Sequence, residues 1–320
     1  MTYFVILLFP CFIFSQSVRI GMNEWFGYAP NIIADQKGFW KDLGLDVSVV
    51  VYNDGNAAID GFNRGDVDIL HDLVSSVSAV YARQKSYSEL HLLAVTNWSY
   101  GGDKILLRKG VSLNDNLGDS IGVFADIDDV RLFLDLFLKT YNRKLSSFYL
   151  EEVMPQELNK RFANGKYTLV VQFDPYAFSL VEKGHAKLVT TSRFFKGVFP
   201  EGWIVRSSFL KQLAPKTLIQ LYLGSTKAVD WINDSKNFKE MIQLLNTYFF
   251  SKSYNYIQYK RMKNGLYFLT GNAFKDANAI HIYRYLEGIN AIRAERNVPL
   301  FSPKLIQAPI LLKQLEEHGF

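Results

Sequence analysis

The sequence predicts an α/β fold, and two observations lead to this class. Strand-like runs rich in valine, isoleucine and leucine recur through the first two thirds of the chain, and helical segments of about ten to fifteen residues separate them. The chain has 320 residues, of which 48% are hydrophobic, so it can bury a large core as one large domain or two medium lobes. Because parallel strands need a crossover of this length, the alternation predicts mixed, mainly parallel sheets flanked by helices.

The first residues predict a secretion signal that is not part of the fold. Residues 4–14 form an uncharged apolar run that is too short to span a bilayer as a helix, and Ser15-Gln16-Ser17 follows it. This order is typical of a cleaved signal peptide, which we place at residues 1–17; the alternative is a buried N-terminal strand. Cys11 follows Pro10 and not a small residue, which disfavours a lipoprotein. We therefore expect a soluble, exported, periplasmic protein without direct membrane insertion.

In the first third of the chain, strands alternate with helices that end at glycines. The expected strands are residues 18–21, 45–52, 67–70 and 92–96. The expected helices surround residues 32–34, with Gly38 as the end, and cover residues 57–62, with Gly65 as the end.

The same alternation continues until about residue 207, after which helical patterns dominate. The expected strands are residues 104–108, 120–124, 147–150 and 169–172, and the helices between them are residues 130–141 and 157–163. The clearest helices of the last third are residues 218–232, 238–249 and 279–294. Since no Gly/Ser-rich linker precedes them, we expect a helical C-terminal tail and not an independent module.

Aromatic and acidic side chains follow the predicted strands, at the edge where α/β sheets bind ligands. These residues are Trp25, Tyr28, Asp54, Asp72, Trp98, Ser99, Asp103, Asp126 and Asp174. Each has a structural alternative, because an aspartate after a strand often caps a helix and a tryptophan there often packs in the core. The gathering of several such residues at one edge predicts a binding site. His71, beside Asp72, is the histidine with a candidate role.

The chain contains an ordered series of short motifs: NEWFGYAP at residues 23–30, ADQKGFW at 34–40, GLDV at 44–47, Asp54-Gly55, GDVD at 65–68, SYGGD at 99–103 and DPY at 174–176. This series resembles the substrate-binding proteins of ABC importers, specifically the nitrate/sulfonate/taurine-type group that includes binders of thiamine-pyrimidine precursors. The resemblance covers about residues 18–205, and the tail matches in length and helicity only.

The resemblance implies a type II periplasmic-binding-protein fold with two lobes. Lobe one would contain residues 18–103 plus 204–320, and lobe two would contain residues 104–203. The crossovers near Asp103–Lys104 and near residues 201–203 would act as the hinge. A small-molecule ligand would lie between the lobes and favour their closed form, which an ABC permease or another membrane receptor would recognise. The protein would act as a monomer.

The residues at the strand ends favour a cationic or amine-bearing ligand. A nitrate or sulfonate site needs basic side chains, yet Lys104 and Arg131 are the nearest ones. Carboxylates beside aromatic faces suit an amine, a quaternary ammonium or an aminopyrimidine instead. The predicted ligand contacts are Trp25, Tyr28, Asp54, Asp72, Trp98, Ser99, Asp103, Asp126, Asp174 and Trp203.

Other functions have weaker support. The thiamine-pyrimidine synthases of fungi, which resemble these binders, carry a cysteine-rich segment, whereas the one cysteine here is Cys11. The five histidines form no HxxxH or HExxH spacing, and the sequence contains neither a GxSxG nor a GxxxxGK[ST] motif. The net charge is +5 without a basic run, which disfavours nucleic acid. We expect no catalysis, metal or cofactor; a ligand sensor for a membrane receptor, or an enzyme on the same fold, is the alternative.

Overall fold

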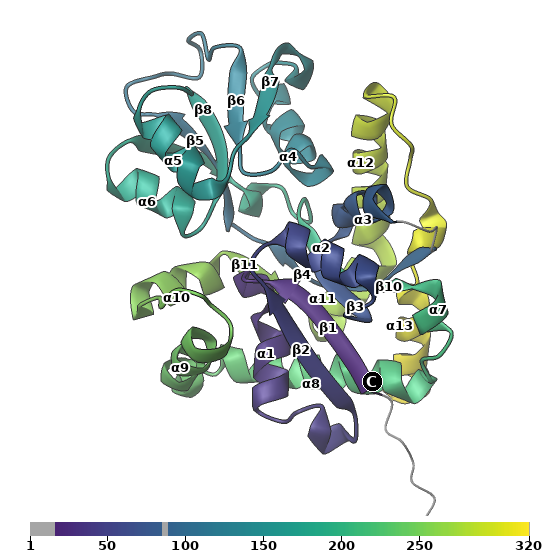
Figure 1. The fold of residues 1–320 in the computed structure, drawn as a ribbon. Helices are drawn as coiled ribbons and strands as arrows, with labels where there is room; N and C mark the ends of the chain where they lie inside the picture. Colours follow the sequence, from purple (N-terminus) through teal and green to yellow (C-terminus); the bar gives the residue numbers. More distant parts are fainter. Residues whose placement is uncertain (1–16, 85–88, 320) are drawn as a thin grey trace, which may run out of the picture.

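The computed structural model describes residues 17–84 and 89–319 and contains two β-sheets, one above the other in Figure 1. The lower sheet has the strand order β11-β4-β10-β3-β1-β2, and the upper sheet has the order β7-β6-β8-β5-β9. Helices flank both sheets, so the α/β class and the two-lobed arrangement are confirmed. The expected signal peptide lies outside the described residues except for Ser17, which begins the first strand.

Lobe one is our name for the lower sheet with its helices, residues 17–99 and 200–319 as far as they are described. Its strands are β1 (Ser17–Asn23), β2 (Asp46–Tyr52), β3 (Ile69–Leu73), β4 (Leu90–Ser99), β10 (Pro200–Arg206) and β11 (Leu266–Phe268). Its first helices are α1 (Ala29–Gln36), α2 (Gly55–Arg64) and α3 (Val77–Arg83). Val18, Ile20 and Met22 of β1 are fully buried, and because they alternate along the strand they point to the same face of the sheet.

Lobe two is our name for the upper sheet with its helices, residues 103–191. Its strands are β5 (Asp103–Arg108), β6 (Ser120–Val123), β7 (Tyr149–Glu152), β8 (Leu169–Phe173) and β9 (Ala186–Thr191). Its helices are α4 (Asp128–Lys139), α5 (Pro155–Ala163) and α6 (Tyr176–Glu182).

Both sheets are mixed, but parallel pairs do not predominate as the sequence suggested. The strands β1, β2 and β3 pair in parallel, as do β6, β7 and β8. In contrast, β10 is antiparallel to β3 and β4, and β5 is antiparallel to β8 and β9. The reason is that β5 and β10 are the strands through which the chain enters each lobe from the other one. Each begins at the edge where its neighbours end.

Two segments connect the lobes, residues 100–102 after β4 and residues 192–199 after β9. Hydrogen bonds join them, because the Ser192 hydroxyl lies 2.8 Å from the Ser99 hydroxyl and accepts the backbone N–H of Gly101 at 2.8 Å. The chain returns to lobe one at Pro200, whose partner is Trp98 of β4. This is earlier than residue 204, where the sequence placed the boundary, since residues 200–203 already pair with lobe one.

The C-terminal tail packs on lobe one, except for one long helix that also contacts α4 of lobe two, and it contains the strand β11 among its helices. Its helices are α7 (Ser207–Leu210), α8 (Pro215–Asn233), α9 (Phe238–Tyr248), α10 (Tyr256–Asn264), α11 (Gly271–Asp276), the π-helical η7 (Ala277–His281), α12 (Ile282–Glu295) and α13 (Ala308–Glu317). The indole of Trp40 donates to the carbonyl of Leu221 at 3.0 Å, which attaches α8 beside α1. Within the described residues, no helix combines the length and apolar character that crossing a bilayer requires.

Candidate functional site

The start of β10 lies beside the ends of β3 and β4, and this position makes Glu201 the centre of a polar cluster. In the register of the sheet, Glu201 pairs with Leu73 of β3 and with Asn97 of β4. Its carboxylate accepts the indole N–H of Trp25, with 2.6 Å between Nε1 and Oε1, and the side-chain amide N–H of Asn97. Trp25 stands directly before the short helix η1 (Phe26–Tyr28) that follows β1. Strand ends from β1, β4 and β10 therefore meet here.

Gly27 leaves the space in which this cluster forms. A Cβ at this position would lie 2.7 Å from Nε1 of Trp25 and 2.6 Å from Nδ2 of Asn97, and still closer to the Glu201 carboxylate. Such contacts are too short for any side chain, so the cluster requires glycine here. Gly102, in the first crossover, is less tightly confined, because its Cβ would lie 3.0 Å from the Gly265 carbonyl oxygen and 3.2 Å from the Trp25 ring.

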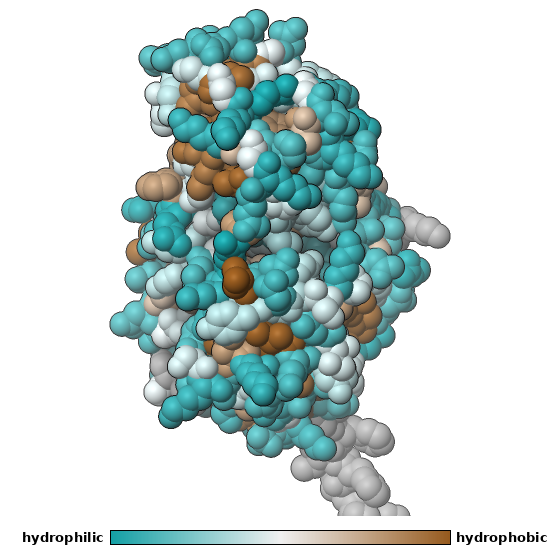
Figure 2. Space-filling view, turned by 90° about the vertical axis from the view of Figure 1, so that its left-hand side faces the viewer, coloured by the Kyte–Doolittle hydropathy of each residue, from teal (hydrophilic) through white to brown (hydrophobic). Residues whose placement is uncertain are grey.

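Lobe two contributes aromatic rings to the same place. Phe173 at the end of β8 meets Trp25 edge to face, with 5.5 Å between ring centroids. Phe124 and Tyr176 flank Phe173 at 5.0 Å and 5.3 Å. The contact between Trp25 and Phe173 therefore joins the two lobes. Seen from the side of α6 and α10, the surface is hollowed between the upper and lower parts of the molecule (Figure 2).

Three carboxylates at this junction are buried among neutral hydrogen-bond donors, and we call Asp72, Asp103 and Glu201 the junction carboxylates. Their exposed fractions are 6%, 5% and 2%. Asp72 accepts the Tyr28 hydroxyl at 3.3 Å and the backbone N–H of Leu73 at 2.8 Å. Burial raises the pKa of Asp72 and of Asp103 to about 6 each. Burial, with the nearby charges of Asp103 and Asp72, raises the pKa of Glu201 well above its usual range.

Of the two basic side chains that the sequence places nearest the site, Lys104 and Arg131, Lys104 lies at the junction and has its own carboxylate partner. Its ammonium group forms a salt bridge with Asp174 and donates to the carbonyl of Gly101 at 2.6 Å. Burial raises the pKa of Asp174, and the nearby Lys104 opposes this effect. The charges of Lys104 and Asp174 thus cancel, and the junction carboxylates keep a surplus of negative charge when they ionise.

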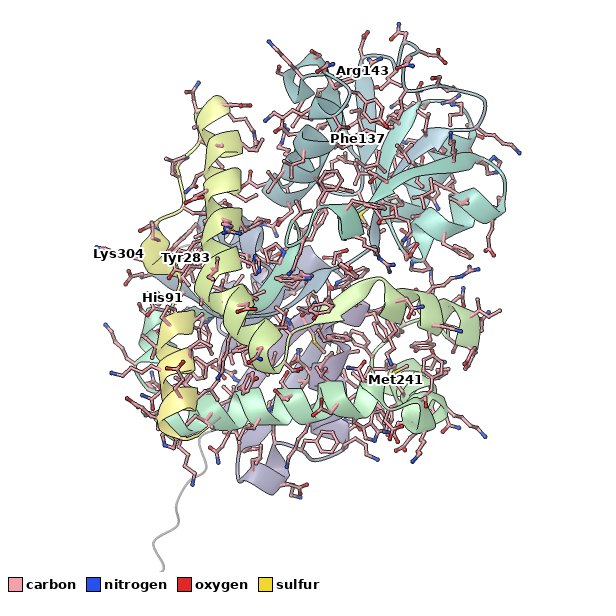
Figure 3. The ribbon with its side chains drawn as sticks, turned by 180° about the vertical axis from the view of Figure 1, so that it is seen from behind. His91, Phe137, Arg143, Met241, Tyr283 and Lys304 are labelled. Carbon is pink, nitrogen blue, oxygen red and sulfur yellow. The ribbon has the colours of Figure 1, made fainter. Side chains whose placement is uncertain are left out.

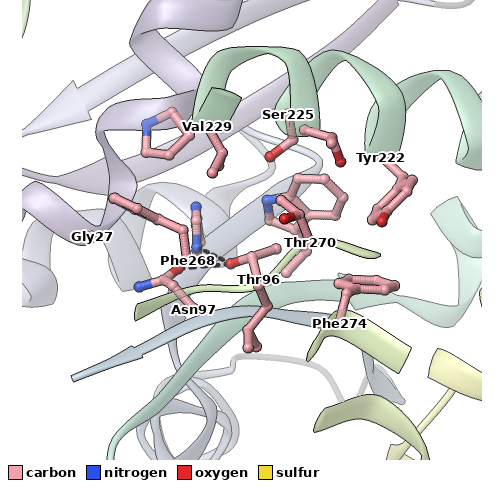
Figure 4. A pocket seen from close by; sticks show the side chains of 14 residues that line it. Gly27, Thr96, Asn97, Tyr222, Ser225, Val229, Phe268, Thr270 and Phe274 are labelled. Atoms are coloured by element: carbon pink, nitrogen blue, oxygen red, sulfur yellow. Dashed lines mark hydrogen bonds between the residues drawn. The ribbon is translucent and has the colours of Figure 1, made fainter. Parts of the chain in front are cut away.

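A hydrogen-bonded chain supports the cluster from inside lobe one. The Thr96 hydroxyl lies 2.8 Å from Nε2 of His71 and donates to Oδ1 of Asn97 at 2.8 Å, and Asn31 lies 2.6 Å from Nδ1 of His71. Burial lowers the pKa of His71 to about 3, so the imidazole is neutral at physiological pH. The cavity beside Thr96 and Asn97 (Figure 4) has a volume of about 10 Å³, which is room for a single water. This interior position is therefore too small for a solute.

Several of the predicted ligand contacts come together at the junction. They are Trp25, Asp72, Asp103 and Asp174. Ser99 lies behind them, where its hydroxyl oxygen accepts the backbone N–H of Asp103 at 3.1 Å. Tyr28 is buried and reaches the junction through its hydrogen bond to Asp72.

The other predicted contacts have structural partners elsewhere. Asp54 is an exposed N-cap whose carboxylate accepts the backbone N–H of Ala57 at 2.8 Å. Asp126 forms an ion pair with Arg131 at 2.6 Å within lobe two. Trp98 stacks on Tyr267, because successive residues of a strand point to opposite faces and Asn97 occupies the junction side. Trp203 is 1% exposed and lines the small internal cavity.

Sequence reasoning did not select Glu201, Asn97, Phe173 or Tyr176 as ligand contacts. Asn97, Phe173 and Tyr176 follow predicted strands, which is where ligand contacts were expected. Their residue types are common, so nothing else in the sequence singled them out. Glu201 carried no such signal, because its place depends on β10 entering the sheet between β3 and β4.

The fold and this junction define a class, the two-lobed periplasmic-binding-protein fold. The chain is similar to the solved periplasmic nitrate-binding protein NrtA from Synechocystis PCC 6803, with 15% identity, a TM-score of 0.73 and coverage of 95% of this chain and 89% of that one. It is also similar to the aliphatic sulphonate-binding protein SsuA from Escherichia coli, with 13% identity, a TM-score of 0.68 and coverage of 92% and 96%. At these identities the likeness establishes the fold.

The chain belongs to the NMT1-like family, whose family model matches residues 15–246. It is also similar to a Brucella abortus (strain 2308) chain described as a binding protein, with 22% identity over 200 residues. This match spans 61% of the present chain and 60% of the Brucella protein.

Proposed function

We propose that the chain is an extracytoplasmic, monomeric solute-binding protein that captures a small amine-bearing or aminopyrimidine solute between its lobes and delivers it to an ABC permease. The family and the fold support the class of protein. One observation carries the ligand class: the junction carboxylates are buried together and their hydrogen-bond partners are neutral. Such carboxylates can bind a cation without taking part in a reaction, so we propose a binding role and not catalysis.

A cationic solute would supply the positive charge that the junction lacks. Burying an ionised carboxylate is unfavourable unless an opposite charge accompanies it. A charge-assisted hydrogen bond to such a carboxylate contributes about 1.5–3 kcal/mol, and a cation over an aromatic face contributes about 0.5–2 kcal/mol. Glu201 and Asp72 offer the first interaction, and the rings of Trp25 and Phe173 offer the second.

Solute entry requires the lobes to separate. The contact between α6 and α10 is weak, so separation there costs little. The Arg261 guanidinium lies 3.1 Å from the centroid of the Phe178 ring, and its ion pair with Glu182 measures 3.4 Å. Both charged side chains of this pair are exposed, so water replaces the pair at little cost. We infer that the cleft opens on this side.

Isothermal titration calorimetry with a panel of solutes tests the ligand class. The panel contains choline, spermidine, an aminopyrimidine precursor of thiamine, nitrate and taurine. We expect saturable binding of at least one of the first three and no binding of the two anions. Tight binding of nitrate or taurine, without binding of any amine, would refute the amine proposal and favour the solutes named for NrtA and SsuA.

Glu201→Gln tests whether the junction binds the solute. It keeps the shape and removes the charge, so we expect the affinity for the amine to fall about hundredfold. Glu287→Gln is the matched control, because Glu287 is exposed on α12 and undergoes the same chemical change. Equal affinities of the two variants would place the solute elsewhere.

A further inference from the structure

The chain makes an excursion from lobe one to lobe two after residue 277. The excursion begins at η7, where the Asn278 side chain bonds both the N–H and the C=O of Val95, at 2.7 Å and 2.9 Å. It ends where the N–H of Gln307 donates to the carbonyl of Leu92 at 3.0 Å. Both anchors lie on β4 of lobe one. Between them, α12 stands beside α4 of lobe two, as seen from the front and from behind (Figures 1 and 3).

A buried ion pair joins α12 to lobe two. Arg293 contacts Asp128 at the start of α4, with 2.5 Å between Nη1 and Oδ2, and the two side chains are 10% and 7% exposed. The same nitrogen donates to the Ser78 hydroxyl of lobe one at 2.7 Å. Arg296 adds a second contact to Asp128 at 3.0 Å. Arg293 thus bonds residues of both lobes at once.

The next residue of α4 makes a second polar bridge. The carboxylate of Asp129 accepts the Tyr285 hydroxyl of α12 at 2.6 Å and the Ser75 hydroxyl of lobe one. Both Asp129 and Tyr285 are buried. The two helices also pack closely beside this bridge, because a Cβ on Gly288 of α12 would lie 3.3 Å from the Leu132 side chain of α4.

The segment that returns to lobe one holds Arg293 in place. The guanidinium lies 4.3 Å from the centroid of the Phe301 ring, and its Nε donates to the carbonyl of Pro299 at 2.5 Å. The side chain of Asn290 on α12 in turn bonds the backbone of Phe301, at 2.8 Å and 2.9 Å. Contacts within the tail itself therefore hold this arginine in place.

We propose that residues 277–306 form a clasp that holds lobe two against lobe one when no solute is bound. The ion pair and the hydroxyl bridge exist in the closed arrangement, and separation of the lobes would leave Arg293 and Asp128 apart. Opening would leave Arg293, which Pro299 and Phe301 hold in place, without the carboxylate that it meets in the closed form. The clasp therefore shifts the solute-free population toward the closed form. On the proposed function, a protein that is already closed part of the time binds its solute more tightly than one that must first close.

Small-angle X-ray scattering of the solute-free protein tests the clasp. We expect the wild-type protein to scatter as the compact arrangement, and Arg293→Gln to have a larger radius of gyration. Arg284→Gln is the matched control, because Arg284 is exposed on the same helix and loses the same charge. If Arg293→Gln does not fold by circular dichroism, Asp128→Asn removes the pair from lobe two, and Tyr285→Phe removes the second bridge.

An unchanged scattering curve in folded variants overturns the clasp and leaves the proposed function intact. A larger radius of gyration in a protein that binds no member of the solute panel supports the clasp and counts against the proposed function. If the clasp and the proposed function are both correct, we expect Arg293→Gln to bind its solute about tenfold more weakly than the wild type.

Discussion

Two groups of carboxylates lie between the lobes, and they differ in what accompanies them. Asp128, at the start of α4, meets the guanidinium groups of Arg293 and Arg296 from the tail. The junction carboxylates have an indole, amide and hydroxyl groups and a backbone N–H as partners. The chain therefore supplies cations to Asp128 and none to the junction carboxylates. In this account, the missing cation is the solute.

Substituting Gly27 at the junction and Gly288 at the clasp should give the largest difference in the free energy of unfolding. Gly27→Ala forces a Cβ into Glu201, Asn97 and Trp25, and we expect a loss of about 1–3 kcal/mol in the free energy of unfolding. We expect solute affinity to fall at least hundredfold as well. Gly288→Ala meets the movable side chain of Leu132 at 3.3 Å inside a helix, where alanine is favoured, so its stability should change by less than about 1 kcal/mol.

Urea unfolding and calorimetry of the two variants measure these effects. Equal losses of stability, or a Gly27→Ala protein with wild-type affinity, would remove the cluster around Glu201 from the binding site.

The pH dependence of the free energy of unfolding should give the next largest difference between the junction and the clasp. Burial raises the pKa of Asp72 from 3.8 to about 6, so the folded state binds a proton more readily than the unfolded state. The free energy of unfolding must then fall as the pH rises through this window, by about 3 kcal/mol for a rise of that size. Asp72→Asn stays neutral and should therefore be more stable than the wild type at pH 8 and nearly equal to it at pH 4.

Asp128→Asn is the contrasting variant, because it leaves the Arg293 guanidinium buried without its partner. We expect it to be less stable than the wild type at pH 8. Urea denaturation of the three proteins at pH 4, 6 and 8 gives the comparison. A stabilising effect of Asp128→Asn, or a destabilising effect of Asp72→Asn at pH 8, would contradict the difference between the regions.

The smallest expected effect concerns the indole of Trp25. Trp25→Phe keeps an aromatic ring against Phe173 and removes the N–H that Glu201 accepts. Loss of one hydrogen bond to a carboxylate should weaken solute binding by about tenfold, and stability should change little. Trp231→Phe, on α8 in lobe one, is a matched control for the change of ring. Calorimetric affinities that do not distinguish the two variants would show that the indole N–H has no part in binding.

The sequence predicted the elements whose local signals are strong. The valine-rich run at β2 and the glycine at position 65 after α2 lie as expected. It did not predict β10, because Pro200, Glu201 and Gly202 are poor strand formers that only the neighbouring strands hold in place.

The candidate site was predicted in part for the same reason. Trp25 and Asp72 follow predicted strands, and the structure brings them to the junction. Glu201 lies there because β10 runs antiparallel between β3 and β4, which no local pattern encodes. Trp98 differs from its neighbour Asn97 in the face of β4 that it occupies, and strand direction sets that face.

The count of protons exchanged on solute binding tests the central claim most directly. It is obtained by calorimetry near pH 7 in buffers of different ionisation enthalpy. A cation that enters beside Asp72, Asp103 and Glu201 lowers their pKa values, so we predict that binding of an amine releases protons and strengthens as the pH rises from 6 to 8. Proton uptake on binding, as an anion beside these carboxylates would cause, would contradict the account.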